Sequence, residues 1–112
     1  MAIQEWSENI TVVELSEDPQ FTDEMAALMD RLAGNPTDVV LNFGAVGFIN
    51  SSNISRLLRL RKAMITNQRR LILCNVNSQV WGVFLVTGLD KIFEFVDDTA
   101  TALATIQLAA GE

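Results

Sequence analysis

Four polar side chains follow one another where an apolar stretch gives way to a helical pattern: Asn50, Ser51, Ser52 and Asn53. One hydroxyl or amide is enough to cap the helix predicted over residues 52–66, so the motif holds more candidates than capping needs. With Asn50 or Ser51 as the cap, the Ser52 hydroxyl falls in the first turn and can face solvent. A phosphate there would add about −1.5 to −2 charges beside the positive end of the helix dipole. Arg56, four residues on, lies on the same face and could pair with it. From the residues alone, capping and phosphorylation both remain open.

Side chains that commonly carry catalysis are scarce. The chain has no histidine and no tyrosine, and histidine is the commonest general base and metal ligand. The lone Cys74 lies in the apolar run LILCNV and is predicted to be a small buried hydrophobe in a cytoplasmic protein. Neither a dinucleotide-binding glycine motif nor a phosphate-binding loop occurs. We therefore expect no enzyme, no catalytic residue, no metal site and no cofactor.

The net charge of −6 conceals an uneven distribution. Residues 1–38 and 90–112 hold all 14 acids, whereas the segment between them holds no acid and six bases: Arg56, Arg59, Arg61, Lys62, Arg69 and Arg70. This basic segment is either a solvated face that balances charge within the fold or a binding patch. Nucleic acid is a poor partner for so acidic a chain. The longest apolar run, residues 81–89, is about half of a membrane span, so no membrane insertion is expected.

The first half of the chain predicts a hairpin, a helix and a buried strand. Residues 3–6 and 10–15 are short runs with β-branched and aromatic residues, separated by a turn. Thr22 is predicted to cap a helix that Gly34 and Pro36 end. Residues 39–43 then read as a buried strand. The apolar positions of the helix repeat as one amphipathic stripe: Met25, Leu28, Met29, Leu32 and Ala33.

The second half continues the alternation. The helix over residues 52–66 is followed by strands over residues 71–76 and 92–96, with a helix capped by Ser78 and ended by Gly88 between them. Asp97 or Asp98 caps a last helix. The residues expected to face inward on the second helix are Ile54, Leu57, Leu58, Met64 and Ile65, and on the last helix Ala102, Leu103, Ile106, Ala109 and Ala110. The alternation predicts one α/β domain over residues 1–112, with a mixed, mostly parallel sheet, an N-terminal hairpin and about four flanking helices.

The helix before Gly88 is apolar on every side. Trp81, Phe84 and Leu85 form the expected inward stripe, which leaves three valines for the opposite side: Val80, Val83 and Val86. An all-apolar helix is either covered by other elements or used as an interface. Self-association or partner contact through these valines therefore remains an alternative to plain burial of the helix.

Two long segments carry a resemblance to a known family: VVLNFGAVGFINSSNISRLLRLRKA, and then RRLILCNVNSQVWGVFLVTGLDKIFEFVDDTATAL. The chain resembles the STAS domain over nearly its whole length, and in particular the bacterial anti-sigma factor antagonists. The strand–loop–serine–helix junction and the segment VTGLDKIFEF are its most specific parts. The resemblance implies a mixed sheet flanked by helices, in the order given above.

The resemblance also implies partner switching. An unphosphorylated antagonist binds an anti-sigma factor that is also a serine kinase, phosphorylation releases it, and a phosphatase resets it. The family motif Asp-Ser-Ser-Gly places the phosphoacceptor at Ser52, with Ser51 as second choice. Asn50 replaces the family's aspartate, and Asn53 replaces its glycine. The implied partner-binding residues are Asn50, Ser51, Ser52, Asn53, Arg56 and Arg59.

The altered motif and the apolar third helix leave a second interpretation. The chain would then be a non-switching STAS module: a scaffold, a dimeric assembly piece or an accessory subunit of a lipid-transport complex. The sequence does not decide between these two classes.

Overall fold

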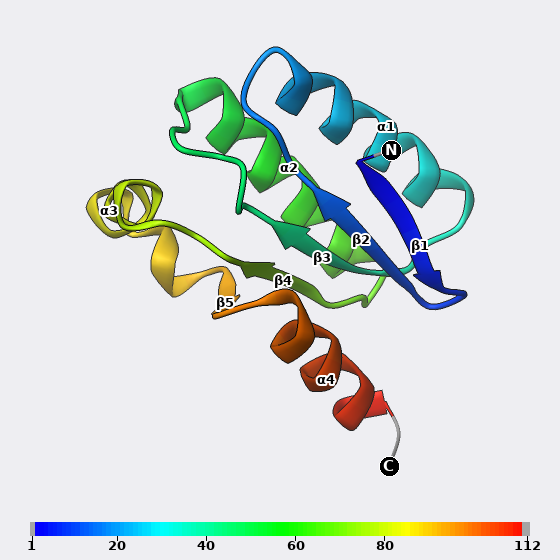
Figure 1. Cartoon of the computed structure of the whole chain (residues 1–112). Helices are drawn as coiled ribbons and strands as arrows, with labels where there is room; N and C mark the ends of the chain where they lie inside the picture. Colours follow the sequence, from blue (N-terminus) through cyan, green and yellow to red (C-terminus); the bar gives the residue numbers. More distant parts are fainter. Residues whose placement is uncertain (1, 111–112) are drawn as a thin grey trace.

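The computed structural model describes residues 2–110, which build a five-stranded sheet (Figure 1). Its strands lie in the order of the sequence: β1 Ile3–Ser7, β2 Ile10–Glu14, β3 Asp38–Asn42, β4 Leu71–Cys74 and β5 Glu94–Val96. β1 pairs with β2 in antiparallel fashion, and the remaining neighbours are parallel. The predicted hairpin and the mixed, mostly parallel sheet are confirmed.

Four α-helices cover the sheet unequally: α1 Gln20–Gly34, α2 Ser51–Thr66, α3 Ser78–Thr87 and α4 Thr99–Ala110. α1 and α2 lie side by side on one face, and α4 lies on the other (Figure 1). α3 lies at the end where the parallel strands finish, and a 3₁₀ turn, η1 (Leu89–Lys91), connects it to β5. Within residues 2–110, no helix is both long and apolar enough to cross a bilayer.

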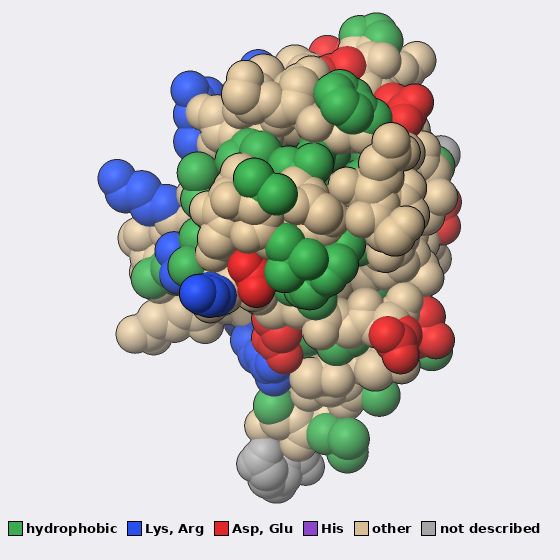
Figure 2. Space-filling view, turned by 90° about the vertical axis from the view of Figure 1, so that its left-hand side faces the viewer, with side chains coloured by type: hydrophobic (Ala, Val, Ile, Leu, Met, Phe, Trp, Pro, Cys, Tyr) green, Lys and Arg blue, Asp and Glu red, His purple; other side chains and the backbone are tan. Residues whose placement is uncertain are grey.

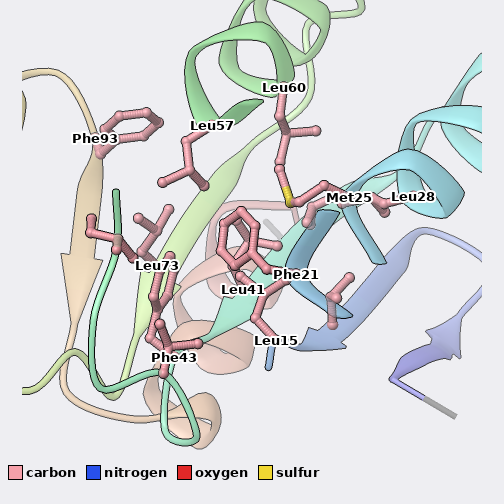
Figure 3. Close-up of a cluster of buried hydrophobic side chains, with 14 of the residues drawn as sticks. Leu15, Phe21, Met25, Leu28, Leu41, Phe43, Leu57, Leu60, Leu73 and Phe93 are labelled. Carbon is pink, nitrogen blue, oxygen red and sulfur yellow. The ribbon is translucent and has the colours of Figure 1, made fainter. Parts of the chain in front are cut away.

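The larger core lies between the sheet and the pair α1 and α2 (Figure 3). Side chains from five elements meet there with almost no exposed surface, among them Phe21, Leu28, Leu41, Leu57, Leu60 and Leu73. Phe84 of α3 joins this core by edge-to-face contacts with Phe43 and Phe95, at centroid distances of 6.3 Å and 5.0 Å. α3 is thereby fixed to the same core that positions α2.

A smaller core lies under α4, on the opposite face of the sheet. Ala102 and Ile106 pack there against Val40 and Ile72. Cys74 is fully buried in this cluster, as predicted, and burial raises the pKa of its thiol. Of the other residues predicted for this face of α4, Leu103 packs against the cluster, Ala109 is exposed, and the side chain of Ala110 lies outside the described residues.

The helix caps differ from the prediction in two places. α1 begins before Thr22, whose N–H and hydroxyl both donate to the Oδ1 of Asp18. α3 is capped by Asn77, not Ser78, because the Asn77 Oδ1 accepts the Val80 N–H at 2.7 Å. Adjacent polar residues compete for such positions, and the packing of the helix decides which one is used. At α4, Asp98 is the cap, since its Oδ1 accepts the Thr101 N–H.

The inward face of α2 is rotated from the predicted one. Leu58 and Ile65 were expected inside but are 38% and 57% exposed, whereas Leu60 is fully buried. The buried positions form one i, i+4, i+7, i+11 stripe: Asn53, Leu57, Leu60 and Met64. One residue around an α-helix is about 100°, so an adjacent leucine faces out. On α1, Ala33 is likewise exposed.

The predicted outward face of three valines on α3 is wrong for Val80, holds only in part for Val83 and is confirmed for Val86. Val80 is fully buried and Val83 packs partly against the larger core, while Val86 is 89% exposed. Leu85, expected inside, is 50% exposed. The helix buries the pair Val80 and Phe84 against the core, which turns its C-terminal residues to solvent. Self-association through this helix stays a prediction and would depend on Leu85 and Val86.

Candidate functional site

The start of α2 is closed by a reciprocal pair of asparagines. The Asn50 Oδ1 accepts the Asn53 N–H at 2.8 Å, and the Asn53 Oδ1 accepts the Asn50 N–H at 3.0 Å. This is a capping box, in which two side chains satisfy two backbone donors of the first turn. The cap is therefore Asn50, not Ser51.

The two serines are left free by this arrangement. Ser51 and Ser52 are both exposed, in the first turn of α2. Within residues 2–110, the side-chain hydrogen bonds at this helix start join Asn50, Asn53 and Asp18 and include neither serine hydroxyl. The Ser52 hydroxyl thus stands in solvent beside a capped helix start, which is the exposure that a phosphoacceptor requires.

Asn53 has a different position from the one predicted. Its side chain is only 3% exposed, because both of its polar atoms are used within the fold. The polar atoms of Asn53 are thus committed within the fold, and its place in a partner-binding surface stays a prediction. Asn50 is exposed and remains accessible from outside.

Asp18, which the sequence analysis did not single out, completes the site. It lies in the loop between β2 and α1, and its Oδ2 accepts hydrogen bonds from Asn53 Nδ2 at 3.0 Å and Asn50 Nδ2 at 3.2 Å. The bond from Asn53 is the main cause that lowers the pKa of Asp18, followed by the bond from Thr22. A carboxylate therefore lies at this motif although position 50 is an asparagine. No local pattern reveals it, because 32 residues separate Asp18 from Asn50.

The loop that leads into α2 is held from two sides. The Gly47 N–H donates to the Glu17 carboxylate at 2.8 Å, and the Asn77 Nδ2 donates to the Val46 carbonyl at 3.2 Å. A Cβ at Gly47 would lie 3.0 Å from that carboxylate, so a side chain here would require the Glu17 carboxylate to shift. Phe48 in this loop is nevertheless 63% exposed to solvent.

The basic segment divides into two groups. Arg69 pairs with Asp38, Arg70 pairs with Glu94 through two short contacts, and Arg61 donates to the Ile92 carbonyl. These three balance charge or bind backbone within the fold. Among residues 2–110, the side chains of Arg56, Arg59 and Lys62 form no ion pair and no hydrogen bond, so these three are available to another molecule.

The end of the molecule that carries α3 presents a mixed surface. Hydrophobic side chains gather near the middle of this face, basic ones along its left edge and acidic ones elsewhere (Figure 2). Phe48, Leu85 and Val86 are the large hydrophobic residues exposed on α3 and on the loop before α2. Among residues 2–110 no group of three histidine, cysteine or acidic side chains could hold a metal ion. The arrangement is one of surface contact: exposed hydroxyls, free cations and apolar side chains.

Comparison with known proteins identifies a family model and a relative. The family model described as the STAS domain matches residues 2–102. A Bordetella bronchiseptica protein that is named as an anti-sigma factor antagonist, BtrV, is 29% identical over 98 residues, covering 88% of this chain and 82% of that protein.

Two solved structures share the fold. A Thermotoga maritima protein that is named as an anti-sigma factor antagonist superposes with a TM-score of 0.83 at 16% identity, covering 94% of this chain and 92% of that one. The Bacillus cell fate determinant SpoIIAA in its phosphorylated form gives a TM-score of 0.71 at 20% identity, covering 92% and 95%.

Proposed function

The chain belongs to the STAS domain family, and from this premise we propose that it is an anti-sigma factor antagonist that works by partner switching. The unphosphorylated chain binds an anti-sigma factor that is also a serine kinase. Phosphorylation of Ser52 weakens this complex, and a phosphatase restores the binding form. The name of BtrV and the phosphorylated form of SpoIIAA support this proposal.

One observation carries the proposal: Ser52 is exposed in the first turn of a helix that another residue caps. A serine that capped the helix would lose its hydrogen bond to the backbone when modified. Here Asn50 and Asn53 satisfy that backbone, so the Ser52 oxygen can take a phosphoryl group without loss of the cap.

The physical effect of the phosphate is a change of surface charge. It brings about −1.5 to −2 charges to a helix whose first turn has no acid. The free N–H groups and the dipole at a helix start favour an anion, so α2 stays folded. A partner that had met a neutral hydroxyl would then meet a dianion close to the Asp18 carboxylate, and its affinity would fall.

The test uses the serine-kinase anti-sigma factors encoded in the same genome. Each is incubated with ATP and either the parent chain, Ser52→Ala or Ser51→Ala, and phosphate is located by mass spectrometry. We expect phosphate on the parent and on Ser51→Ala but not on Ser52→Ala. Phosphate lost only in Ser51→Ala would move the site to Ser51. Absence of phosphate with every kinase, together with undiminished binding of Ser52→Asp, would refute the switch.

A non-switching module remains the second candidate, favoured by the exposure of Leu85 and Val86. Light scattering of the parent and of Val86→Glu tests it. A dimer that Val86→Glu dissociates would support assembly through α3, whereas a monomer in both would exclude it.

A further inference from the structure

A groove separates α1 from α2 about one turn beyond Ser52. It has a volume of about 300 Å³ and is lined by Met25, Ala26, Met29, Asp30, Arg56 and Arg59. α1 contributes the first four of these residues, and α2 contributes the two arginines. The groove lies outside the cap network, which involves none of its lining residues.

The two arginines leave strong hydrogen-bond donors unused. Within residues 2–110, neither Arg56 nor Arg59 contacts an acid closely enough to form an ion pair. The Arg56 Nε is moreover shielded from solvent and has no acceptor. A buried donor without a partner is unfavourable, and a planar guanidinium suits a carboxylate in particular. Although Asp30 also lines the groove, it is not paired with either arginine, so both guanidinium groups can receive an acid from a ligand.

The floor of the groove is apolar. Met25 is buried and Met29 is half-buried, so their side chains form the base, while Ala26 is exposed at the opening. Methionine side chains adapt to varied apolar partners. A ligand that fills this groove combines an acid for the arginines with an apolar side chain for the methionines.

The charge of the whole chain favours a protein over a nucleic acid. The net charge is −6, and Asp30 lies at the groove itself. A run of phosphodiesters would be repelled by so acidic a chain along its length, whereas one or two carboxylates could lie on the two arginines alone. Arg56 and Arg59 are three residues apart, which places both guanidinium groups on one face of α2.

We propose that this groove docks an acidic, apolar segment of the anti-sigma factor, with carboxylates on Arg56 and Arg59 and an apolar side chain over Met25 and Met29. This inference rests on the proposed function and names the chemistry of the partner. It also explains how phosphorylation of Ser52 would release the partner. A phosphate on Ser52, four residues before Arg56, competes for the same guanidinium and withdraws it from the partner's carboxylate.

The first experiment compares two alanines on the exposed side of α1. Ala26 lines the groove, and Ala27 is exposed next to it but does not. Affinity for each serine-kinase anti-sigma factor of the genome is measured with the parent, Ala26→Trp and Ala27→Trp. We expect Ala26→Trp to weaken the complex about tenfold or more and Ala27→Trp to change it by less than about twofold. Equal affinities of the two variants would overturn the proposal that the groove docks the partner. Binding by the parent would still support the proposed function.

The second experiment removes one positive charge at a time from α2, inside and outside the groove. Arg56→Gln and Arg59→Gln are compared with Lys62→Gln, a residue that is exposed on α2 outside the groove. We expect about a tenfold loss for each arginine and a small change for the lysine, with the arginine effects reduced at high salt. A loss of equal size in all three variants would show a diffuse charge effect and would overturn the specific site.

A third measurement does not depend on any kinase. The labelled chain is titrated in an NMR experiment with the blocked peptide Leu-Glu-Leu-Leu-Glu and with the same peptide carrying lysine in place of glutamate. We expect only the acidic peptide to shift the methyl signals of Met25, Ala26 and Met29. Shifts elsewhere, or equal shifts with the basic peptide, would overturn the proposal even where no kinase binds the parent.

Discussion

The Asp18 carboxylate accepts a hydrogen bond from the Asn53 side chain over 3.0 Å, across 35 residues of sequence. Through this contact the loop before α1 is tied to the first turn of α2. The same carboxylate also accepts from Thr22 and Asn50, so one exposed acid organises two helix starts. Its removal is therefore expected to affect both helices.

Asp18→Asn is predicted to be less stable than the parent at neutral pH and to lower the melting temperature by a few degrees. The pKa of Asp18 is lowered in the folded chain, mainly by Asn53. The stabilisation is thus complete above the ordinary value of 3.8 and is lost as the pH falls through the lower folded pKa. Urea unfolding at several pH values should show a constant gap between parent and variant above about pH 5 that narrows below about pH 4.

The matched control for this variant is Asp97→Asn, which removes an exposed acid that takes no part in either helix start. Its stability should follow the parent across the same pH range. A gap for Asp18→Asn that widened in acid would contradict the assigned role of the carboxylate.

Restoring the family's aspartate at position 50 is predicted to be unfavourable in this chain. The Asn50 Nδ2 donates to Asp18 at 3.2 Å, and Asn50→Asp would replace that donor with a second carboxylate. Asn50→Asp should therefore lower the melting temperature. Asp18→Asn should be less harmful in the Asn50→Asp background than in the parent, because it removes the repulsion. Additive effects in this double-mutant cycle would show that the two side chains are not coupled.

Two leucines on α2 provide a comparison of burial. Leu60 is fully buried between α2 and the sheet, whereas Leu58 is 38% exposed. Leu60→Ala is predicted to lower the free energy of unfolding by about 2–5 kcal/mol. Leu58→Ala should cost less than about 1 kcal/mol. Denaturant unfolding measures both, and similar losses would mean that the face of α2 is assigned incorrectly.

Two glycines at α3 are predicted to respond to alanine in opposite directions. Gly82 lies inside the helix with open space where a Cβ would be, so Gly82→Ala should stabilise the chain by about 0.5–1 kcal/mol. Gly88 ends the helix in the left-handed region at φ 76°, where a side chain is strained. Gly88→Ala should therefore cost about 1–2 kcal/mol. Thermal unfolding of the pair checks the signs, and a loss of stability in Gly82→Ala would contradict the first assignment.

The sequence predicts those features of the fold that depend on local residue patterns. The alternation of strands and helices, the opening hairpin and the end of α3 at Gly88 follow from periodicity and from residues with restricted backbone preferences. The exposure of Ser52 also follows, because the motif offers Asn50 as an earlier cap. The fold class can be predicted from the sequence because local patterns set the order of its strands and helices.

What depends on contacts between distant segments could not be predicted. Asp18 has no sequence signal that connects it to Asn53, and the buried position of Asn53 results from that contact. The ion pairs that occupy Arg69 and Arg70, and thereby distinguish them from Arg56, form with Asp38 on β3 and Glu94 on β5. On α2, adjacent leucines differ by about 100° in direction, so a small rotation of the helix decides which one is buried.

The position of Cys74 gives the chain an internal reporter. Its sulfur is completely covered, lies 3.5 Å from the Thr99 hydroxyl at the start of α4, and belongs to the only cysteine of the sequence. A thiol reagent can reach it only when α4 lifts from the sheet, and burial, which raises the pKa of the thiol, keeps it protonated and unreactive while α4 is in place. The labelling rate of unmodified protein therefore measures how often the C-terminal helix detaches, on the face of the sheet opposite α2.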